Sequence, residues 1–262
     1  MILDLGPITN NEAVELRELV RSPKVRAEKQ LYIAEGPHLI QSALEFAKKD
    51  LVEIYATEEA RSEQAEIITS SGKRIRSISQ KNAERIAETA TTQGLFALMK
   101  MPESVRSIQP SIMLALDDVQ DPGNVGTIIR TAAWFGVYDL LVTAATADAY
   151  SPKVLRATQG AIFSAHVTRV TDLAARLSTL KQAGYSVVSA TLDNSAITLS
   201  KFKPTNRMIL VLGSEAHGIS KSVDHIADKK IYIPKFGKGE SLNVAISCGI
   251  ILEKLAASNL AG

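Results

Sequence analysis

IPKFGKGESLNVAISCGIILEKL, residues 233–255, carries the end of a strand, a loop and the start of a helix within one short stretch. Pro234 ends the strand-like run before it, because proline cannot donate a backbone hydrogen bond to a neighbouring strand. Gly237 and Gly239 then allow backbone conformations that other residues resist. Ser241 is a favourable N-cap, so we expect a helix to open there. A polar loop that leads into a helix N-terminus is a place where a charged or polar ligand binds.

The helix predicted after Ser241 is apolar on almost every side. Its apolar residues are Leu242, Val244, Ala245, Ile246, Ile250, Ile251, Leu252 and Leu255. Its first turn carries the polar side chain of Asn243, which can donate and accept hydrogen bonds. Because a helix that is apolar all round is buried, we expect it to be covered by its own domain plus a partner.

Length and composition are those of a soluble globular protein. The 262 residues suffice for one large or two ordinary domains, and 45% are hydrophobic and 22% charged. No apolar run is long enough to cross a bilayer and residues 1–10 show no signal-peptide pattern, so we expect a cytoplasmic protein. A net charge of +2 means that any nucleic-acid binding depends on local basic patches. The single cysteine, Cys248, excludes an internal disulfide and a cysteine-based metal cluster.

Predicted strands and helices alternate along the chain, which indicates an α/β architecture in two parts. Residues 1–100 form the first domain, with a mostly parallel sheet. Residues 101–110, MPESVRSIQP, contain two prolines and little periodicity, which predicts a linker. Residues 111–262 form the second domain, which begins with an apolar strand at 112–116.

A basic cluster lies near the start of the first domain. It consists of Arg17, Arg21, Lys24, Arg26 and Lys29. One interpretation is a solvated basic turn. The other is a patch that contacts nucleic-acid phosphates, because basic groups clustered beside a loop set nucleic-acid affinity and register.

Three loops of the second domain each follow a predicted strand: residues 117–124, 213–220 and 234–241. In an open α/β sheet, such loops meet in one crevice where ligands bind. The loops and their flanks supply Asn124, Arg130, Glu215, Ser241 and Asn243. This set offers hydrogen-bond donors and one cation but no evident nucleophile. It favours a reaction in which the protein positions two substrates and stabilises charge over covalent catalysis.

Several common kinds of site are disfavoured. No G-x-G-x-x-G follows a predicted strand and no Walker pattern is present, which weakens dinucleotide and nucleoside-triphosphate binding. The four histidines show no metal-ligand spacing. No G-x-S-x-G nucleophile elbow occurs. A zinc enzyme, a hydrolase and a nucleotide-binding oxidoreductase are therefore weak alternatives.

Three stretches resemble, in order, the motifs of the SpoU (TrmH) family of RNA ribose 2′-O-methyltransferases, within the SPOUT class. They are DPGNVGTIIRTAAWFG at 121–136, LVLGSEAHGIS at 210–220 and IPKFGKGESLNVAISCGIILEK at 233–254. The resemblance is highly specific over residues 110–262. More weakly, RAEKQLYIAEGPHLIQSAL at 26–44 resembles the ribosomal-protein-like α/β substrate-binding domain found before many such enzymes.

This resemblance implies a SPOUT-type α/β fold whose C-terminal segment forms a trefoil knot, a feature that periodicity alone does not reveal. It also implies a homodimer, which agrees with the apolar C-terminal helix. The implied cofactor is S-adenosylmethionine, with no metal required. Carried over by motif position, the cofactor-contacting residues are Thr191, Leu212, Gly213, Ile233, Ser241 and Leu242.

The resemblance also assigns the catalytic positions to Arg130, Asn124, Glu215, Ser241 and Asn243. Family proposals make the arginine the base for the ribose 2′-hydroxyl. Because a guanidinium with a pKa above about 12 is a poor base, we expect Arg130 to orient the ribose and its neighbouring phosphate. A phosphate oxygen or water would then take the proton. Lys235 and Lys238 are a local departure, since many relatives carry fewer charges there, and they would add a phosphate contact.

We therefore expect an S-adenosylmethionine-dependent RNA 2′-O-methyltransferase. Ribosomal RNA is favoured over transfer RNA because the extra N-terminal domain suggests a way to grasp structured RNA. The expected RNA contacts are Arg21, Lys24, Arg26, Lys29 and Arg130. Two alternatives remain, a tRNA 2′-O-methyltransferase and a catalytically inert RNA-binding module of the same fold. The intact catalytic positions argue against the inert module.

Overall fold

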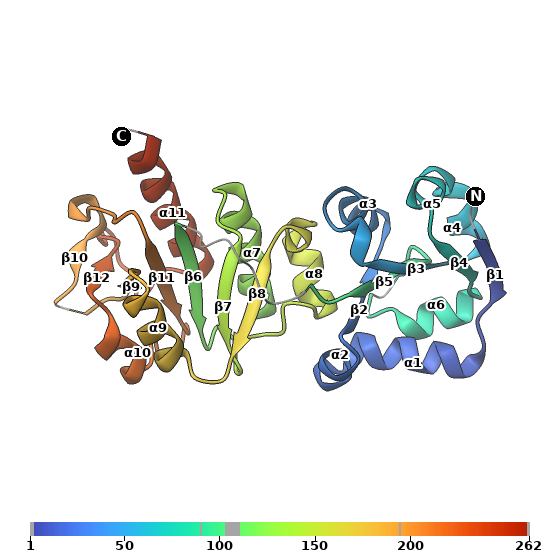
Figure 1. Ribbon diagram of the computed structural model, residues 1–262, viewed down its shortest axis with the longest axis horizontal. Coiled ribbons are helices and arrows are strands. Elements are labelled where there is room, and N and C mark those ends of the chain that lie inside the picture. The colour runs from blue at the N-terminus through green and yellow to red at the C-terminus, as the bar shows by residue number, and fades with distance from the viewer. Residues whose placement is uncertain (1–2, 90, 103–110, 194, 261–262) are drawn as a thin grey trace. The chain divides into compact units, whose positions relative to one another are not determined.

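The computed structural model describes residues 3–89, 91–102, 111–193 and 195–260. The chain divides into two compact units (Figure 1). They comprise Met1–Glu103 with Asp148–Ser164, and Ser104–Ala147 with Ala165–Gly262. Of the predicted linker, residues 103–110 lie outside the described residues. The segment 148–164, which the sequence placed in the second domain, packs with the first unit instead.

The first unit is a five-stranded sheet in the order β1-β4-β3-β5-β2. Its strands are β1 (Leu3–Pro7), β2 (Leu31–Glu35), β3 (Leu51–Ala56), β4 (Arg74–Ser77) and β5 (Leu95–Lys100). Its helices are α1 (Asn10–Arg21), α2 (Pro23–Lys29), α3 (Pro37–Phe46), α4 (Glu58–Glu63), α5 (Ala65–Ser71), α6 (Gln80–Ile86) and α8 (Pro152–Thr158). In Figure 1, α1 and α6 lie on one face of this sheet, and α3, α4 and α5 lie on the other.

The prediction of a mostly parallel sheet is wrong for this unit, because its sheet is mixed. β4 pairs parallel with β1 and β3, whereas β5 is antiparallel to both β3 and β2. Residue periodicity indicates that a segment is a strand but carries no information about its direction.

The second unit is built on a seven-stranded sheet in the order β10-β12-β9-β11-β6-β7-β8. Its strands are β6 (Ile112–Asp117), β7 (Asp139–Thr143), β8 (His166–Val170), β9 (Ser186–Ala190), β10 (Ile197–Thr198), β11 (Met208–Gly213) and β12 (Lys229–Tyr232). All the described strand pairs are parallel. Strands β6 and β11 are nearly continuous apolar runs because helices cover both faces of a parallel sheet.

Among the residues described for this unit, four α-helices cover the sheet. They are α7 (Pro122–Trp134), α9 (Leu173–Gln182), α10 (Lys221–Ile226) and α11 (Val244–Leu260). Helices α9 and α10 pack together on one face, and α7 and α11 pack together on the other (Figure 1). Gly249 of α11 lies next to Thr131 of α7. Because the strands are parallel, the loops after β6, β9, β11 and β12 lie at the same edge of the sheet.

Arg26 is buried, so its predicted role as an RNA contact is wrong. Its side chain is 3% exposed and pairs with Asp148 at 2.6 Å, from Nη2 to Oδ2. It also donates to the carbonyl oxygens of Leu19 and Val20 at 2.6 and 2.8 Å. The guanidinium therefore ties the segment that begins at Asp148 to α1 and α2 within the first unit.

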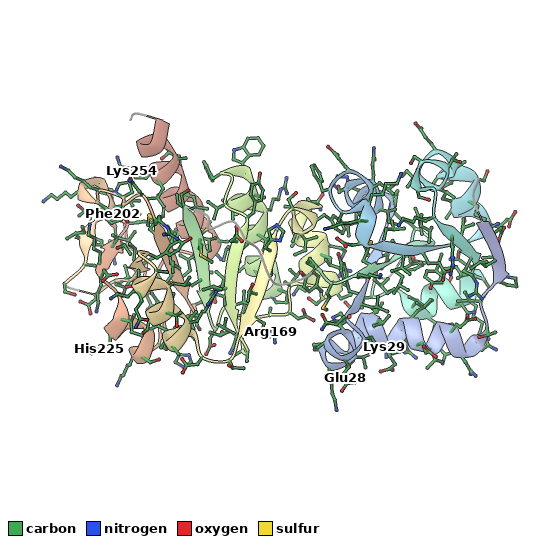
Figure 2. The ribbon with its side chains drawn as sticks, viewed as in Figure 1. Glu28, Lys29, Arg169, Phe202, His225 and Lys254 are labelled. Carbon is green, nitrogen blue, oxygen red and sulfur yellow. The ribbon has the colours of Figure 1, made fainter. Side chains whose placement is uncertain are left out.

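The other predicted RNA contacts of this unit lie on its surface. Arg21 is exposed. Lys24 lies 3.8 Å from Glu28, and Lys29 lies 3.1 Å from Glu15; Glu28 and Lys29 are labelled on α2 in Figure 2. Exposed ion pairs contribute only about 0–1 kcal/mol, so both ammonium groups can exchange their carboxylate partner for a phosphate. Their RNA contacts stay predictions.

Replacing Arg26 with alanine should destabilise the first unit, because the Asp148 carboxylate and two carbonyl groups lose their donor. Removing one partner of a buried ion pair costs about 3–5 kcal/mol. The Asp148 side chain is 18% exposed, which favours the lower end, about 3 kcal/mol. Urea denaturation followed by circular dichroism measures this loss. Lys24→Ala, in an exposed pair, is the matched control and should cost less than about 1 kcal/mol. Equal stability of the two variants would contradict the buried pairing.

Candidate active site

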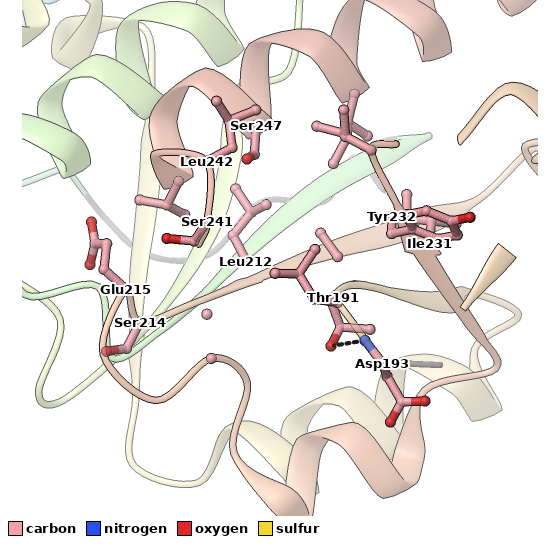
Figure 3. A pocket seen from close by; sticks show the side chains of 17 residues that line it. Thr191, Asp193, Leu212, Ser214, Glu215, Ile231, Tyr232, Ser241, Leu242 and Ser247 are labelled. Atoms are coloured by element: carbon pink, nitrogen blue, oxygen red, sulfur yellow. Dashed lines mark hydrogen bonds between the residues drawn. The ribbon is translucent and has the colours of Figure 1, made fainter. Parts of the chain in front are cut away.

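A cavity of about 430 Å³ lies at the carboxyl edge of the parallel sheet, within the second unit (Figure 3). It is found where β9, β11 and β12 end, at Ala190, Gly213 and Tyr232. Ligands of open α/β sheets bind at this edge. The volume also lies within the range of small-molecule sites, roughly 300–1,000 Å³.

All six residues predicted to contact the cofactor line this cavity. They are Thr191, Leu212, Gly213, Ile233, Ser241 and Leu242. Figure 3 shows Thr191, Leu212 and Ser241 around the same opening, although they come from three separate parts of the chain. The fold brings the predicted set together, and its contact with a cofactor stays a prediction.

Sequence reasoning missed several lining residues, among them Asp193, Tyr232, Ser247 and Ile251. Ser247 and Ile251 are four residues apart on α11, so they present one helix face to the cavity. Asp193 and Tyr232 lie at or just after the ends of strands β9 and β12. The available signal was position, because residues at the carboxyl ends of parallel strands face this edge.

Asp193 brings a negative charge to the cavity. The Ser195 hydroxyl and backbone N–H donate to its carboxylate at 2.5 and 2.7 Å, and Lys230 lies 3.6 Å away. These hydrogen bonds, with a smaller effect of Lys230, lower the pKa of Asp193 below its ordinary value. The carboxylate is therefore ionised at neutral pH and suits a ligand that carries positive charge or hydroxyl donors.

Strand β11 ends in a tight turn that leaves no room for a side chain at Gly213. Ser214 and Gly218 exchange two backbone hydrogen bonds of 3.0 and 2.8 Å. A Cβ atom at Gly213 would collide with the backbone of Gly218 and Ile219. Gly218 itself has a φ of +69°, which glycine adopts without strain. The turn that carries Glu215 to the cavity therefore depends on glycine at both positions.

Three predicted catalytic residues from separate parts of the chain form one chain of hydrogen bonds. Asn124 Nδ2 donates to Glu215 Oε1, and Asn243 Nδ2 donates to Asn124 Oδ1 at 2.9 Å. Asn243 Oδ1 accepts from the backbone N–H groups of Ala245 and Ile246 at 2.9 and 3.2 Å. Glu215 also lines the cavity, so the chain of bonds ends at the ligand site.

The helix that was expected to open at Ser241 begins at Val244 instead. Asn243 caps it, because its side-chain oxygen accepts two N–H groups of the first turn. Asparagine is as favourable an N-cap as serine, so the sequence offered two candidates. Ser241 lies exposed before the cap and lines the cavity.

Two aspartates fix the loop between β6 and α7. Asp117 is 4% exposed and accepts from the backbone N–H of Ser220 at 2.8 Å, which joins this loop to the one after β11. Asp121 caps α7 by accepting from the backbone N–H of Asn124 at 2.8 Å. These bonds hold Asn124 beside the loop of Glu215 before any ligand binds.

Arg130 lies exposed on α7, the helix that also carries Asn124. Its side chain makes no hydrogen bond or ion pair with any residue that the structure describes. A guanidinium without a carboxylate partner is able to bind a phosphate in bidentate fashion. Its predicted role in orienting RNA stays a prediction.

Other kinds of site are missing from the part of the chain that the structure describes. There, no group of three or more His, Cys, Asp or Glu side chains could hold a metal ion. No helix within the same described ranges is long and apolar enough to cross a membrane. Burial raises the pKa of the Cys248 thiol to about 12, so this residue offers no thiolate near neutral pH.

Gly213→Ala should disrupt the turn after β11, because the added Cβ meets backbone that cannot move away like a flexible side chain. Overpacking of this kind costs about 1–3 kcal/mol, and the cavity wall should lose its shape. Thermal unfolding and calorimetric titration of S-adenosylmethionine measure the two effects. Gly237→Ala is the matched control, since nothing lies within 4 Å of a Cβ atom there. A Gly213→Ala protein that matches this control would contradict the close approach.

Two family descriptions match the chain. The SpoU rRNA Methylase family matches residues 111–253, and the MRM3-like substrate binding domain matches residues 10–97. The first match covers more than half of the chain and includes the cavity and the bonded residues Asn124, Glu215 and Asn243.

Individual relatives extend over nearly the whole chain. The 23S rRNA (guanosine(2553)-2′-O)-methyltransferase RlmP of Bacillus subtilis is 31% identical over 94% of this chain and 96% of its own. A TrmH-family RNA methyltransferase structure from Porphyromonas gingivalis has 32% identity and a TM-score of 0.83, covering 94% of this chain and 97% of that one. The AdoMet-bound rRNA methyltransferase of Sinorhizobium meliloti has 26% identity and a TM-score of 0.82, covering 99% and 98%. With its family match and its aligned relatives, this chain belongs to the SpoU rRNA methylase family.

Proposed function

We propose that this protein transfers a methyl group from S-adenosylmethionine to the 2′-hydroxyl of a ribose in RNA. The observation that carries this proposal is the hydrogen-bonded chain of Glu215, Asn124 and Asn243 at a cavity lined by the expected cofactor residues. Family membership and the RNA 2′-O-methyltransferase among the relatives support the same activity.

The cavity fits S-adenosylmethionine in size and chemistry. Leu212, Ile233 and Leu242 offer apolar surface for an adenine ring, and Thr191 and Ser241 offer hydroxyl groups. The Asp193 carboxylate matches a cofactor that carries positive charge and ribose hydroxyls. When bound, this cofactor supplies an electrophilic methyl group on a sulfonium. An AdoMet-bound relative of the same fold supports the assignment.

The residues of the chain contribute alignment to this reaction. Glu215 and Asn124 are fixed at the cavity by hydrogen bonds and by the Asp117 and Asp121 anchors. Arg130 holds the phosphate beside the reacting ribose, and it keeps its proton throughout because a guanidinium is a poor base. Holding two reactants in line lowers an activation barrier by about 7–11 kcal/mol, so proximity accounts for much of the acceleration. A phosphate oxygen or water takes the hydroxyl proton.

Ribosomal RNA is the favoured substrate, and the cytoplasm the favoured location. The Bacillus subtilis relative, which aligns along both units, acts on 23S rRNA by its name. The first unit matches a substrate binding domain over residues 10–97. Arg21, Lys24 and Lys29 on its surface are the proposed phosphate contacts, without the buried Arg26. Transfer RNA as the substrate is an outcome of the test below.

We infer that two copies associate through α7 and α11. The two helices pack against each other, and each leaves large apolar side chains exposed. Trp134 on α7 is 86% exposed, and Ile246 and Ile250 on α11 are 54% and 40% exposed. Side chains of this size are normally covered, and a second copy would bury them on both protomers.

Methyl transfer is tested with methyl-labelled S-adenosylmethionine and separate ribosomal and transfer RNA fractions, followed by alkaline digestion. Alkali cleaves RNA through the 2′-hydroxyl, so a 2′-O-methyl group protects the adjacent bond. We expect label in alkali-resistant dinucleotides from ribosomal RNA. Arg130→Ala should lower this transfer by about 100-fold or more, comparable to loss of a transition-state donor, while leaving cofactor affinity unchanged.

The matched control is Arg176→Ala, an exposed arginine on α9. Near-normal turnover of Arg130→Ala would remove Arg130 from the mechanism. Label in transfer RNA alone would identify transfer RNA, and not ribosomal RNA, as the substrate. The absence of label from both fractions, despite cofactor binding, would favour the inert module.

Charging the exposed face of α11 should separate the two copies. Ile250→Asp places a carboxylate where the partner helix would pack, and desolvating an unpaired charge is costly. Sedimentation should report a folded monomer of 28.3 kDa in place of a dimer. Phe46→Asp, at an exposed apolar position on α3, should leave assembly unchanged. A dimeric Ile250→Asp protein would place the interface elsewhere.

A further inference from the structure

Phe236 is the most exposed of the large hydrophobic side chains in the described ranges. It is 97% exposed and lies in the loop between β12 and α11. Leaving a whole phenyl ring in water is unfavourable, because burying it contributes about 1.5–3 kcal/mol. The ring is not among the residues that line the cofactor cavity. Its exposure is therefore unexplained by the site described above.

The loop that carries this ring begins and ends at the cavity. Tyr232 and Ile233 at its start and Ser241 and Leu242 at its end all line the cavity (Figure 3). Lys235 Nζ donates to the carbonyl oxygen of Gly239 at 2.7 Å, which closes the intervening residues into a loop. Phe236, Gly237 and Lys238 therefore form its tip.

Two lysines lie close to Phe236 in the loop sequence. Lys235 and Lys238 flank Phe236, and Glu240 is the acidic residue in the same loop. An exposed aromatic ring between cations is the combination with which proteins bind single-stranded nucleic acids, since the ring stacks on a base and the cations contact phosphates. The cores of protein–protein interfaces, in contrast, are depleted in lysine.

The surroundings of Phe236 differ from those of the apolar residues assigned to the dimer. Ile246 and Ile250 are aliphatic and lie one turn apart on α11, which itself packs on α7. Phe236 stands alone at a loop tip between two lysines. Charge complementarity favours a polyanion with stackable rings over a second copy of the chain.

We propose that Phe236 is a stacking platform for an unpaired base of the RNA substrate, with Lys238 contacting the adjoining phosphate. This inference rests on the proposed methyl transfer to RNA and narrows its substrate class. A base stacks on a side chain only when it is splayed out of a helix, as in loops, bulges and strand ends. The RNA substrate therefore presents an unpaired nucleotide in the region that this loop contacts.

The test compares Phe236→Ala, Phe236→Leu and Phe236→Trp in the full chain. Binding to unmodified 23S rRNA and transfer RNA transcripts is measured without cofactor, and binding to heparin serves as a polyanion that lacks bases. For both Ala and Leu, loss of the ring should weaken binding by about tenfold to the unmodified transcript that the parent protein binds more tightly, within the range for one stacked base. Trp should bind like the parent protein. Heparin affinity should be the same for all three.

A second variant tests the phosphate contact. Lys238→Gln should weaken binding to both RNA and heparin and reduce the salt slope of RNA binding by about one unit. Phe46→Ala is the control for an exposed phenylalanine in the first unit. Cofactor affinity and sedimentation are recorded for every variant. Cofactor affinity should not change with the Phe236 substitutions, because Phe236 lies outside the cavity lining.

Each outcome decides the proposal. Unchanged RNA affinity of Phe236→Ala overturns the platform, as does a Phe236→Leu protein that binds like the parent, because leucine is apolar without a π face. Dissociation of Phe236→Ala into monomers reassigns the ring to the dimer interface. Failure of the proposed methyl transfer can be distinguished from failure of the stacking platform. The binding measurements test stacking even when the parent protein transfers no methyl group.

Discussion

The hydrogen-bonded chain from Glu215 through Asn124 to Asn243 is the interaction on which the candidate site depends. It joins the first turn of α7 to the loops after β11 and β12. The residues at its two bonds are 91 and 119 positions apart in sequence. Its direction is fixed at one end, because Asn243 Oδ1 accepts from the first turn of α11 and leaves only its Nδ2 to donate. Asn124 must then accept with Oδ1 and present Nδ2 to Glu215. An aspartate at position 124 would instead place two carboxylates side by side.

The parallel sheet makes this chain of bonds possible. Strands β6, β11 and β12 run in the same direction, so the loops that follow them emerge at one edge of the sheet. Asp117, at the end of β6, reinforces this convergence by binding the backbone of Ser220 from a buried position. The glycine at 213 then lets the chain turn back over itself. The parallel sheet brings the loops close to one another, and a few polar contacts then fix their geometry.

The convergence of three loops at this site could be predicted from strand order, whereas the cofactor residues were assigned by the resemblance to the SpoU family motifs. The six expected cofactor residues line one cavity, and the three polar residues meet directly. The predictions that were wrong concerned features set by contacts between residues distant in sequence. In the sequence, Arg26 is one of five clustered basic residues, and only the structure, through its pairing with Asp148, shows that it is buried. The antiparallel direction of β5 and the first residue of α11 were likewise hidden, since periodicity does not encode direction and two good capping residues lay close together.

Different parts of the 233–255 stretch lie in different surroundings, which explains why it is rich in both polar and apolar residues. Its beginning and end shape the cavity, through Ile233, Ser241 and Leu242. Its helix buries Cys248, Ile251 and Leu252 against its own unit while Ile246 and Ile250 remain exposed. The tip around Phe236 faces solvent and belongs to neither role. The proposed contacts to the cofactor, to a second copy and to RNA thus fall on separate parts of one stretch, so a substitution at the tip is expected to change RNA binding without disturbing the cavity or the helix.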